Sequence, residues 1–260
     1  MCGPEGPTKD EPNTGKYGNL NRRVKPDLYG DLLAESHAVI TGIPGNGNAK
    51  ILMGGLLSVG KRPDLQKHPN AEDHRQVVEF IEDVGRVNAY EVASLHPYAF
   101  KGDGKGSKAE RRNPSAPTDS KDVKKVTERV KGNIVIARAA LDDLGKSGEE
   151  KPIWITEIGW PVKGGGAEND GSHLLVTQDI QRDLLNSTFE MMKGESPLSP
   201  KQDPDIEHIS YYNAEDWVAG LPVELDPHSW DSHCGLIEDN EGPKHGNKRK
   251  AWFAFQQQAE

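Results

Sequence analysis

Residues 151–161 read KPIWITEIGWP, and this stretch decides how the rest of the chain is interpreted. The apolar run over residues 153–158 predicts a short buried strand with Glu157 at its C-terminal end. Gly159 and Pro161 follow at once, so the chain must turn there. A carboxylate at the end of a buried strand is costly unless it is paired or used. Glu157 is therefore a candidate for chemistry; the alternative is that it caps the next loop or pairs with an arginine.

The rest of the chain alternates helices with strands. Apolar spacing predicts helices over residues 26–43, 71–85, 119–144, 174–193 and 247–258. Apolar runs predict strands over residues 50–56, 91–98, 153–158 and 207–212. Such alternation predicts an α/β fold with a parallel sheet and right-handed crossovers. A doubly wound open sheet fits this order, but polar and aromatic residues at the C-terminal ends of successive strands favour a TIM-type (β/α)8 barrel.

The segment around Glu157 resembles the nucleophile strand of retaining glycoside hydrolases built on (β/α)8 barrels, the large clan that includes cellulases, xylosidases and β-glucanases. In that clan a glutamate closing strand seven is the nucleophile, and the resemblance implies this role for Glu157. Indole rings offer flat apolar faces that stack on sugars and an N–H that can donate to hydroxyls. Trp160 is accordingly expected to contact the substrate.

The second carboxyl that the resemblance implies is Glu11. Retaining glycosidases need two carboxyls about 5–5.5 Å apart, and in this clan the acid/base stands in an Asn-Glu-Pro segment that ends strand four. The chain has Asp10-Glu11-Pro12 ahead of the first helix. Asp10 takes the place of the asparagine that hydrogen-bonds the sugar 2-hydroxyl, and it lacks the amide donor. An acidic tail without a catalytic part is the alternative.

The predicted strand before the Glu157 strand ends in Leu95-His96-Pro97-Tyr98. This resembles the His-x-Tyr segment of the clan's strand six, where the histidine lies near the nucleophile and the tyrosine can hydrogen-bond its carboxylate. A hydroxyl donor holds a carboxylate ionised and oriented. The resemblance therefore implies that His96 and Tyr98 belong to the substrate site. The alternative is a proline-induced turn with a packing tyrosine.

Residues 211–217, YYNAEDW, follow the last predicted strand. The clan carries a substrate-binding aromatic residue and then an acidic one at this place, which implies substrate contacts by Tyr212, Asp216 and Trp217. Residues 235–244, GLIEDNEGPK, resemble the clan's segment that leads into the final helix. This second match concerns the scaffold rather than catalysis.

The resemblance covers nearly the whole chain, but only strands four to eight of the family's barrel. Five strands cannot close an eight-stranded barrel. We therefore expect residues 1–260 to form one partial, incomplete barrel domain lacking the first three βα units, the C-terminal part of a larger enzyme, with residues 1–25 loop-like. The family's early strands supply further substrate contacts, so activity of this chain alone is left open.

Three interpretations follow. The first is hydrolysis of O-glycosidic bonds in a β-linked oligo- or polysaccharide by a retaining double-displacement mechanism. The second is a non-catalytic carbohydrate-binding barrel remnant, which keeps Trp160, Tyr212 and Trp217 but has no need of Glu11. The third is an unrelated α/β protein whose resemblance is local. The sugar, the linkage, exo or endo action and the oligomeric state are not set by the sequence.

Composition narrows the classes of partner. The formal net charge is −9 with a pI near 5.5, which argues against nucleic acid as a partner, because phosphate binding needs a basic face. No stretch approaches the roughly 20 apolar residues of a membrane span. The first ten residues, MCGPEGPTKD, show neither a basic nor an apolar signal-peptide region; a parent protein that starts upstream of Met1 and is exported would explain this.

Neither a cofactor nor a metal is predicted. One loop holds four residues of metal-ligand type, His228, Asp231, His233 and Cys234. Their spacing matches no zinc pattern, which favours a polar loop. Residues 145–147, Gly-Lys-Ser, lack the upstream glycine of a phosphate loop. Cys2 and Cys234 are the only cysteines, and their placement does not predict a disulfide.

Overall fold

The computed structural model describes residues 26–57, 72–85, 87–98, 120–162, 175–216, 233–238 and 246–259. The expectations placed on Asp10, Glu11, Trp217 and Cys2 lie outside these ranges. Within them, no helix combines the length and the apolar character needed to cross a bilayer.

A four-stranded parallel sheet forms the centre of the described structure. Its strands are β1 (Leu52–Leu57), β2 (Val92–His96), β3 (Ile153–Ile155) and β4 (Ile206–Ile209). They lie side by side in the order β1-β2-β3-β4, and each pair is parallel. The predicted α/β fold with a parallel sheet is confirmed, and chain order equals spatial order in this sheet. β2 is buried along most of its length, as expected for a parallel strand covered on both faces.

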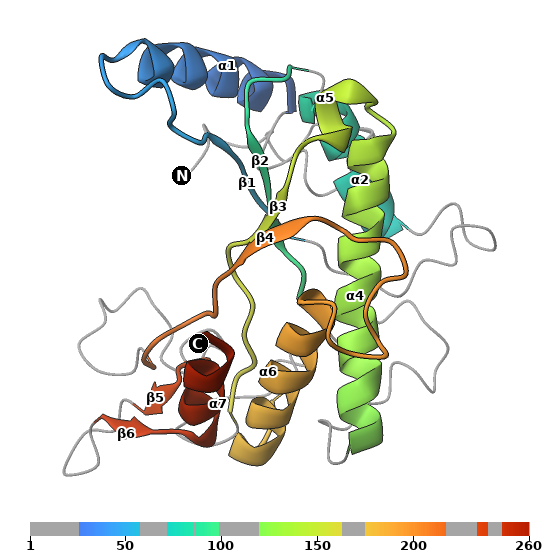
Figure 1. The fold of residues 1–260 in the computed structure, drawn as a ribbon, viewed down its shortest axis with the longest axis vertical. Coiled ribbons are helices and arrows are strands. Elements are labelled where there is room, and N and C mark those ends of the chain that lie inside the picture. Colours follow the sequence, from blue (N-terminus) through green and yellow to red (C-terminus); the bar gives the residue numbers. More distant parts are fainter. Residues whose placement is uncertain are drawn as a thin grey trace, which may run out of the picture.

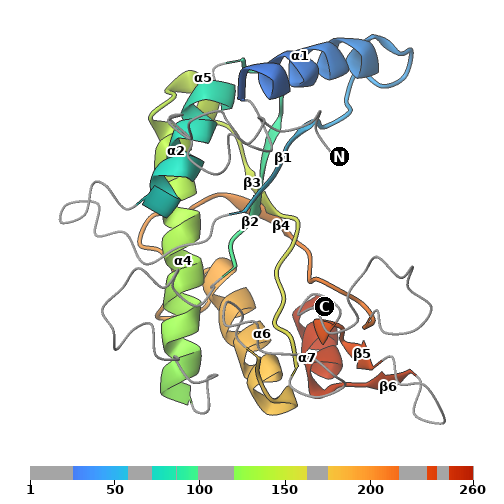
Figure 2. The ribbon, with the colours of Figure 1, turned by 180° about the vertical axis from the view of Figure 1, so that it is seen from behind.

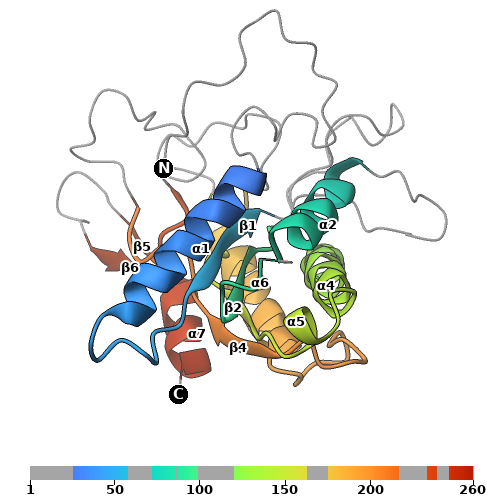
Figure 3. The ribbon, with the colours of Figure 1, turned by 90° about the horizontal axis from the view of Figure 1, so that it is seen from above.

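Helices follow the strands as predicted and cover the sheet. They are α1 (Pro26–Gly42), α2 (Glu72–Gly85), α4 (Ser120–Asp142), the short α5 (Lys146–Glu149), α6 (Gln178–Met192) and α7 (Lys250–Ala259). Each long helix packs on the next, so that α1, α2, α4, α6 and α7 form a row. Figures 1 and 2 show α2, α4 and α6 along one side of the strands, and Figure 3 shows the row curving around them from above.

The longest helix shows why this layer holds together. Apolar residues of α4 recur three or four positions apart and are all buried: Val123, Val126, Val130, Ile134, Ala137 and Leu141. This spacing puts them on one stripe of the helix, which faces the core. Thr177 caps the start of α6: its side chain accepts a hydrogen bond from the Ile180 N–H at 3.3 Å, a normal N-cap.

The first helix and the C-terminal strand pair depart from the regular alternation of parallel strands and packed helices. α1 buries Leu33 and packs on α2, while Leu28, Leu32 and Val39 of its predicted apolar set stay exposed. Near the C-terminus, β5 (Ile237–Glu238) and β6 (Asn247–Lys248) form a small antiparallel pair. That pair was not predicted from the sequence, because two residues show no periodicity. It places Arg249, directly before α7, beside the loop after β4.

Candidate active site

Glu157 lies just beyond the C-terminal end of β3, where the sequence predicts it. The Thr156 N–H donates to the Leu95 carbonyl at 3.2 Å, which carries the pairing with β2 one residue past the strand. The chain then bends at Gly159, where an added β-carbon would lie 1.9 Å from the Tyr212 carbonyl oxygen. Only glycine fits so close an approach. The turn thus sets Glu157 at the sheet edge where the C-terminal ends of the strands meet.

Two side chains from β2 and its end face the Glu157 carboxylate. The Tyr98 hydroxyl donates to Glu157 Oε1 at 2.6 Å. His96 Nδ1 lies 3.4 Å from Glu157 Oε2, a charge-pair distance that is long for a hydrogen bond. The carboxylate is 27% exposed and the imidazole 23%. Each carboxylate oxygen therefore has its own neighbour, and the group remains open to a ligand.

Burial sets the protonation of both neighbours. Burial raises the pKa of Tyr98, and its hydrogen bond to Glu157 raises that pKa further, so the hydroxyl is a permanent donor. Burial also lowers the pKa of His96, although the nearby Glu157 charge opposes this. A lowered pKa makes the imidazole neutral at pH 7. The two groups that orient Glu157 are thus neutral.

Further residues hold these groups in place. The Asn133 side-chain amide on α4 donates to the Tyr98 carbonyl at 3.0 Å. β1 breaks register between Met53 and Leu56, and at this irregularity the His96 ring packs so close to Gly55 that an added β-carbon would lie 2.3 Å from Nε2. The sequence analysis did not find Asn133 or Gly55. The pair of glycines in a strand was the available signal for Gly55; Asn133 has no local signal.

Two hydroxyl groups also lie behind His96. Thr156 Oγ1 is 3.1 Å from His96 Nε2, and it is 2.5 Å from Ser94 Oγ. Ser94 was missed by the sequence analysis, although it precedes His96 by two residues in a strand and so shares its side.

The other predicted site residues lie elsewhere around this edge. Tyr212 is half-buried just after β4, and its N–H donates to the Ile158 carbonyl at 2.8 Å. Trp160 is 3% exposed and packs against Tyr211, with ring centroids 6.3 Å apart. Asp216 is buried beside Arg249. Substrate contacts by Tyr212, Trp160 and Asp216 stay predictions. Asp10, Glu11 and Trp217 lie outside the described residues, so their roles stay predictions as well.

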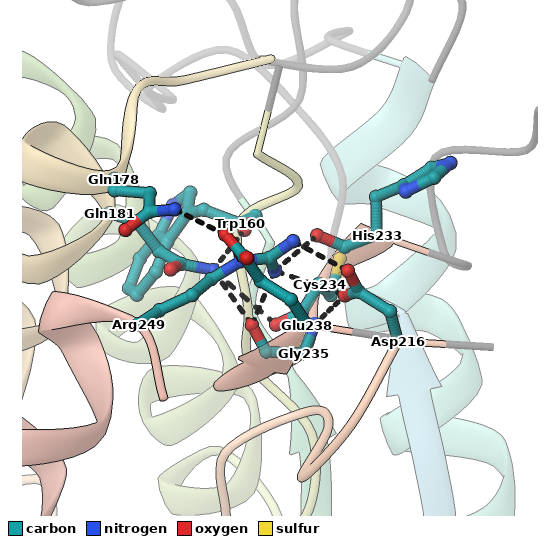
Figure 4. A network of polar contacts seen from close by, with 9 residues as sticks. All are labelled: Trp160, Gln178, Gln181, Asp216, His233, Cys234, Gly235, Glu238 and Arg249. Carbon is teal, nitrogen blue, oxygen red and sulfur yellow. Dashed lines mark hydrogen bonds and ion pairs between the residues drawn. The ribbon is translucent and has the colours of Figure 1, made fainter. Parts of the chain in front are cut away.

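Asp216 belongs to a buried polar network that Figure 4 shows from close by. Both of its oxygens accept from the Arg249 guanidinium, at 3.0 and 2.5 Å. Arg249 also donates to the carbonyls of His233 and Gly235, and the Gln181 amide donates to the Trp160 carbonyl at 3.0 Å. Burial raises the pKa of Asp216, against the opposing effect of Arg249. The network ties α6, α7 and the loop that follows Glu157 to one another.

Within the described ranges, no three side chains of histidine, cysteine, aspartate or glutamate gather into a metal site. Cys234 is buried. The cluster that stands out for chemistry is therefore Glu157 with Tyr98 and His96. An oriented and accessible carboxylate can act as a nucleophile, as a general base or as a stabiliser of positive charge.

No protein-family model and no curated protein matches the sequence. Solved structures that resemble the fold include several glycoside hydrolases. A glycoside hydrolase family 17 β-1,3-glucanosyltransferase from Rhizomucor miehei is 14% identical over 89% of this chain and 61% of its own, with a TM-score of 0.47. An endo-laminarinase from Formosa Hel1_33_131 is 15% identical over 93% of this chain and 61% of its own, with a TM-score of 0.49. A β-glucuronidase from an uncultured Clostridium is 10% identical over 89% of this chain and 35% of its own, with a TM-score of 0.41.

This chain therefore spans about three fifths of the length of the glucanosyltransferase and the laminarinase. At these identities and TM-scores, the resemblance concerns the backbone fold and does not indicate an activity. The residues around Glu157 are the feature of this chain that points to a function.

Proposed function

We propose that this chain acts in the hydrolysis of O-glycosidic bonds of a β-linked oligo- or polysaccharide by a retaining mechanism, with Glu157 as the nucleophile. One observation carries the proposal: the Tyr98 hydroxyl donates to Glu157 Oε1 at 2.6 Å, while His96 faces the other oxygen. A carboxylate that only pairs with the scaffold needs no such exposed, two-sided orientation. An oriented nucleophile does, because misplacement of the attacking atom slows the reaction.

In the proposed reaction, a Glu157 oxygen attacks the anomeric carbon and the bond from that carbon to the leaving oxygen breaks. Glu11 gives its proton to the leaving oxygen. Glu11 then takes a proton from water, whose oxygen attacks the same carbon and releases Glu157 from the ester. Tyr98 holds Glu157 in position for attack through its hydrogen bond. The role of Glu11 rests on the family resemblance alone.

The remaining sugar contacts are proposed according to their exposure. Tyr212 is half-buried beside the turn at Gly159 and is proposed as an aromatic contact. Trp160 and Asp216 are buried against Tyr211 and Arg249, so a sugar reaches them only if the loops around them move.

We further propose that the four parallel strands are the last four of a (β/α)8 barrel and that residues 1–260 are one domain. The one-way strand order, the helix after each strand and the polar residues at the strand C-termini support this. An eight-stranded barrel needs further strands to close.

A panel of aryl β-glycosides tests the proposal on the 260-residue chain. Wild type is compared with Glu157→Gln, Glu11→Gln and the control Glu207→Gln, whose exposed carboxylate pairs with Lys50 across the sheet. We expect turnover with retention of the anomeric configuration, a loss of about 10³-fold or more in Glu157→Gln, and an unchanged rate in the control. Equal rates in wild type and Glu157→Gln would remove the nucleophile assignment. Sugar binding without turnover, unaffected by Glu11→Gln, would favour the carbohydrate-binding interpretation.

A further inference from the structure

Two hydroxyl groups stand behind His96 with no role in the proposed reaction so far: Ser94 is buried and Thr156 is half-buried. The β2–β3 register pairs Leu95 with Ile155, so His96 comes to lie beside Thr156. Ser94 precedes His96 by two residues and points to the same side of the strand. The result is a continuous line of contacts: Ser94 Oγ to Thr156 Oγ1 at 2.5 Å, Thr156 Oγ1 to His96 Nε2 at 3.1 Å, and His96 Nδ1 to Glu157 Oε2 at 3.4 Å.

The ring of His96 is fixed in this line from a third side. The backbone of Gly55 in β1 is so close to the ring that a β-carbon there would lie 2.3 Å from Nε2. The two ring nitrogens therefore have separate partners, a hydroxyl for Nε2 and a carboxylate for Nδ1. Which nitrogen carries the proton decides whether the ring attracts or repels Glu157.

We propose that Thr156 and Ser94 are positioning residues that hold His96 as the tautomer with its proton on Nδ1, so that an N–H faces the Glu157 carboxylate. This proposal deepens the proposed function and rests on it, because it takes Glu157 to be the nucleophile.

The order of donors follows from the carboxylate. An ionised carboxylate only accepts hydrogen bonds, so Nδ1 must carry hydrogen if it is to attract Oε2. A neutral ring then has a lone pair on Nε2, which requires the Thr156 hydroxyl to donate. With its hydrogen used, Thr156 Oγ1 accepts from Ser94. The opposite order would place the Nδ1 lone pair 3.4 Å from a carboxylate oxygen, which is repulsive.

Burial supports the neutral ring that this order needs. Ser94 is 2% exposed, and burial lowers the pKa of His96. Water therefore does not replace the hydroxyl donor on the Ser94 side. Without the Thr156 hydroxyl, the Nε2 lone pair loses its donor, which favours a proton on Nε2, and the ring would then repel the carboxylate it is meant to orient.

Nitrogen NMR of the imidazole rings tests the proposal, since the two ring nitrogens of a neutral histidine differ strongly in chemical shift. The 260-residue chain, labelled with ¹⁵N in its nine histidines, is compared with Thr156→Val, Thr156→Ser and Ser94→Ala, and His96→Gln assigns the signal. Thr127→Val is the control: the Thr127 hydroxyl likewise contacts a serine, donating to Ser187 at 3.0 Å, and Thr127 is fully buried.

We expect wild type and Thr127→Val to show His96 protonated on Nδ1. Thr156→Val should move the proton to Nε2, Thr156→Ser should restore the wild-type signal, and Ser94→Ala should cause a smaller shift than Thr156→Val. On an active chain, Thr156→Val should lower kcat about tenfold with little change in KM. A wild-type proton on Nε2, or a Thr156→Val signal equal to wild type, would overturn the proposal. The NMR result does not depend on turnover, so a chain without glycosidase activity would end the proposed function and leave the tautomer assignment standing.

Discussion

The carbonyl oxygen of Tyr212 occupies the space that a side chain on Gly159 would need, 1.9 Å from the position of a β-carbon. The turn after Glu157 is therefore locked against the end of β4, and the Tyr212 N–H closes the contact by donating to the Ile158 carbonyl at 2.8 Å. The position of Glu157 depends on this backbone contact as much as on its hydrogen-bond partners.

Gly159→Ala should consequently disturb both stability and activity. The methyl group meets backbone rather than a flexible side chain, so the turn must shift, and we expect a loss of about 3 kcal/mol or more in the free energy of unfolding. Gly132→Ala is the control, because nothing lies within 4 Å of its added β-carbon in α4; alanine there should stabilise by roughly 0.5–1 kcal/mol. Urea unfolding measures both. A Gly159→Ala protein as stable as wild type would show that the turn is not held by this contact.

Tyr98→Phe removes the hydroxyl that donates to Glu157 and keeps the ring. A hydrogen bond to a charged group is worth about 1.5–3 kcal/mol, so kcat/KM should fall by roughly 10- to 150-fold. Tyr90→Phe is the control: Tyr90 is fully buried, and its hydroxyl has no hydrogen-bond partner among the described residues. Steady-state kinetics on an aryl glycoside measures the change. A Tyr98→Phe rate within twofold of the Tyr90→Phe rate would show that the hydroxyl does not serve Glu157.

Most elements of the fold follow from the sequence, but their ends do not. The strand predicted over residues 153–158 ends at Ile155 in the structure, because an apolar run indicates burial rather than ladder pairing. Ile158 is fully buried although it lies beyond the strand. β2 likewise stops at His96, where Pro97 has no N–H to continue the ladder.

The candidate site, too, follows only in part from the sequence. Glu157, His96 and Tyr98 were found because they end strands that follow one another along the chain, and neighbouring strands bring their ends together. Asn133 reaches Tyr98 from the middle of α4, and Arg249 reaches Asp216 from just before α7. Those contacts depend on how helices pack against loops far away in the sequence, which no local pattern shows.

The lowered pKa of His96 predicts a pH dependence of stability. In the unfolded chain, the imidazole takes up a proton below about pH 6.5. In the folded protein, burial lowers the pKa of the ring, although the Glu157 charge opposes this. The unfolded state then binds more protons, so stability falls as the pH falls. Between about pH 8 and pH 5, the free energy of unfolding of wild type should decrease more than that of His96→Gln, with parallel curves above the ordinary histidine pKa. Urea titrations at each pH measure this, and the other histidines are present in both proteins. Equal decreases, or a larger one in His96→Gln, would contradict the prediction.

Variants of the buried pair of Asp216 and Arg249 distinguish a scaffold role of Asp216 from a contact of Asp216 with the sugar. Their side chains are 4% and 6% exposed, and removing one partner of such a pair strands a buried charge, so Asp216→Ala should cost about 3–5 kcal/mol of unfolding free energy. Arg249→Met should cost a similar amount, and the double variant less than the sum, because it strands neither charge. Asp179→Ala, which breaks an exposed pair with Lys250, should leave the urea midpoint almost unchanged. If Asp216→Ala instead raised KM and left the midpoint at the wild-type value, Asp216 would serve the substrate rather than the fold. Strictly additive losses in the double variant would mean that the two side chains act separately.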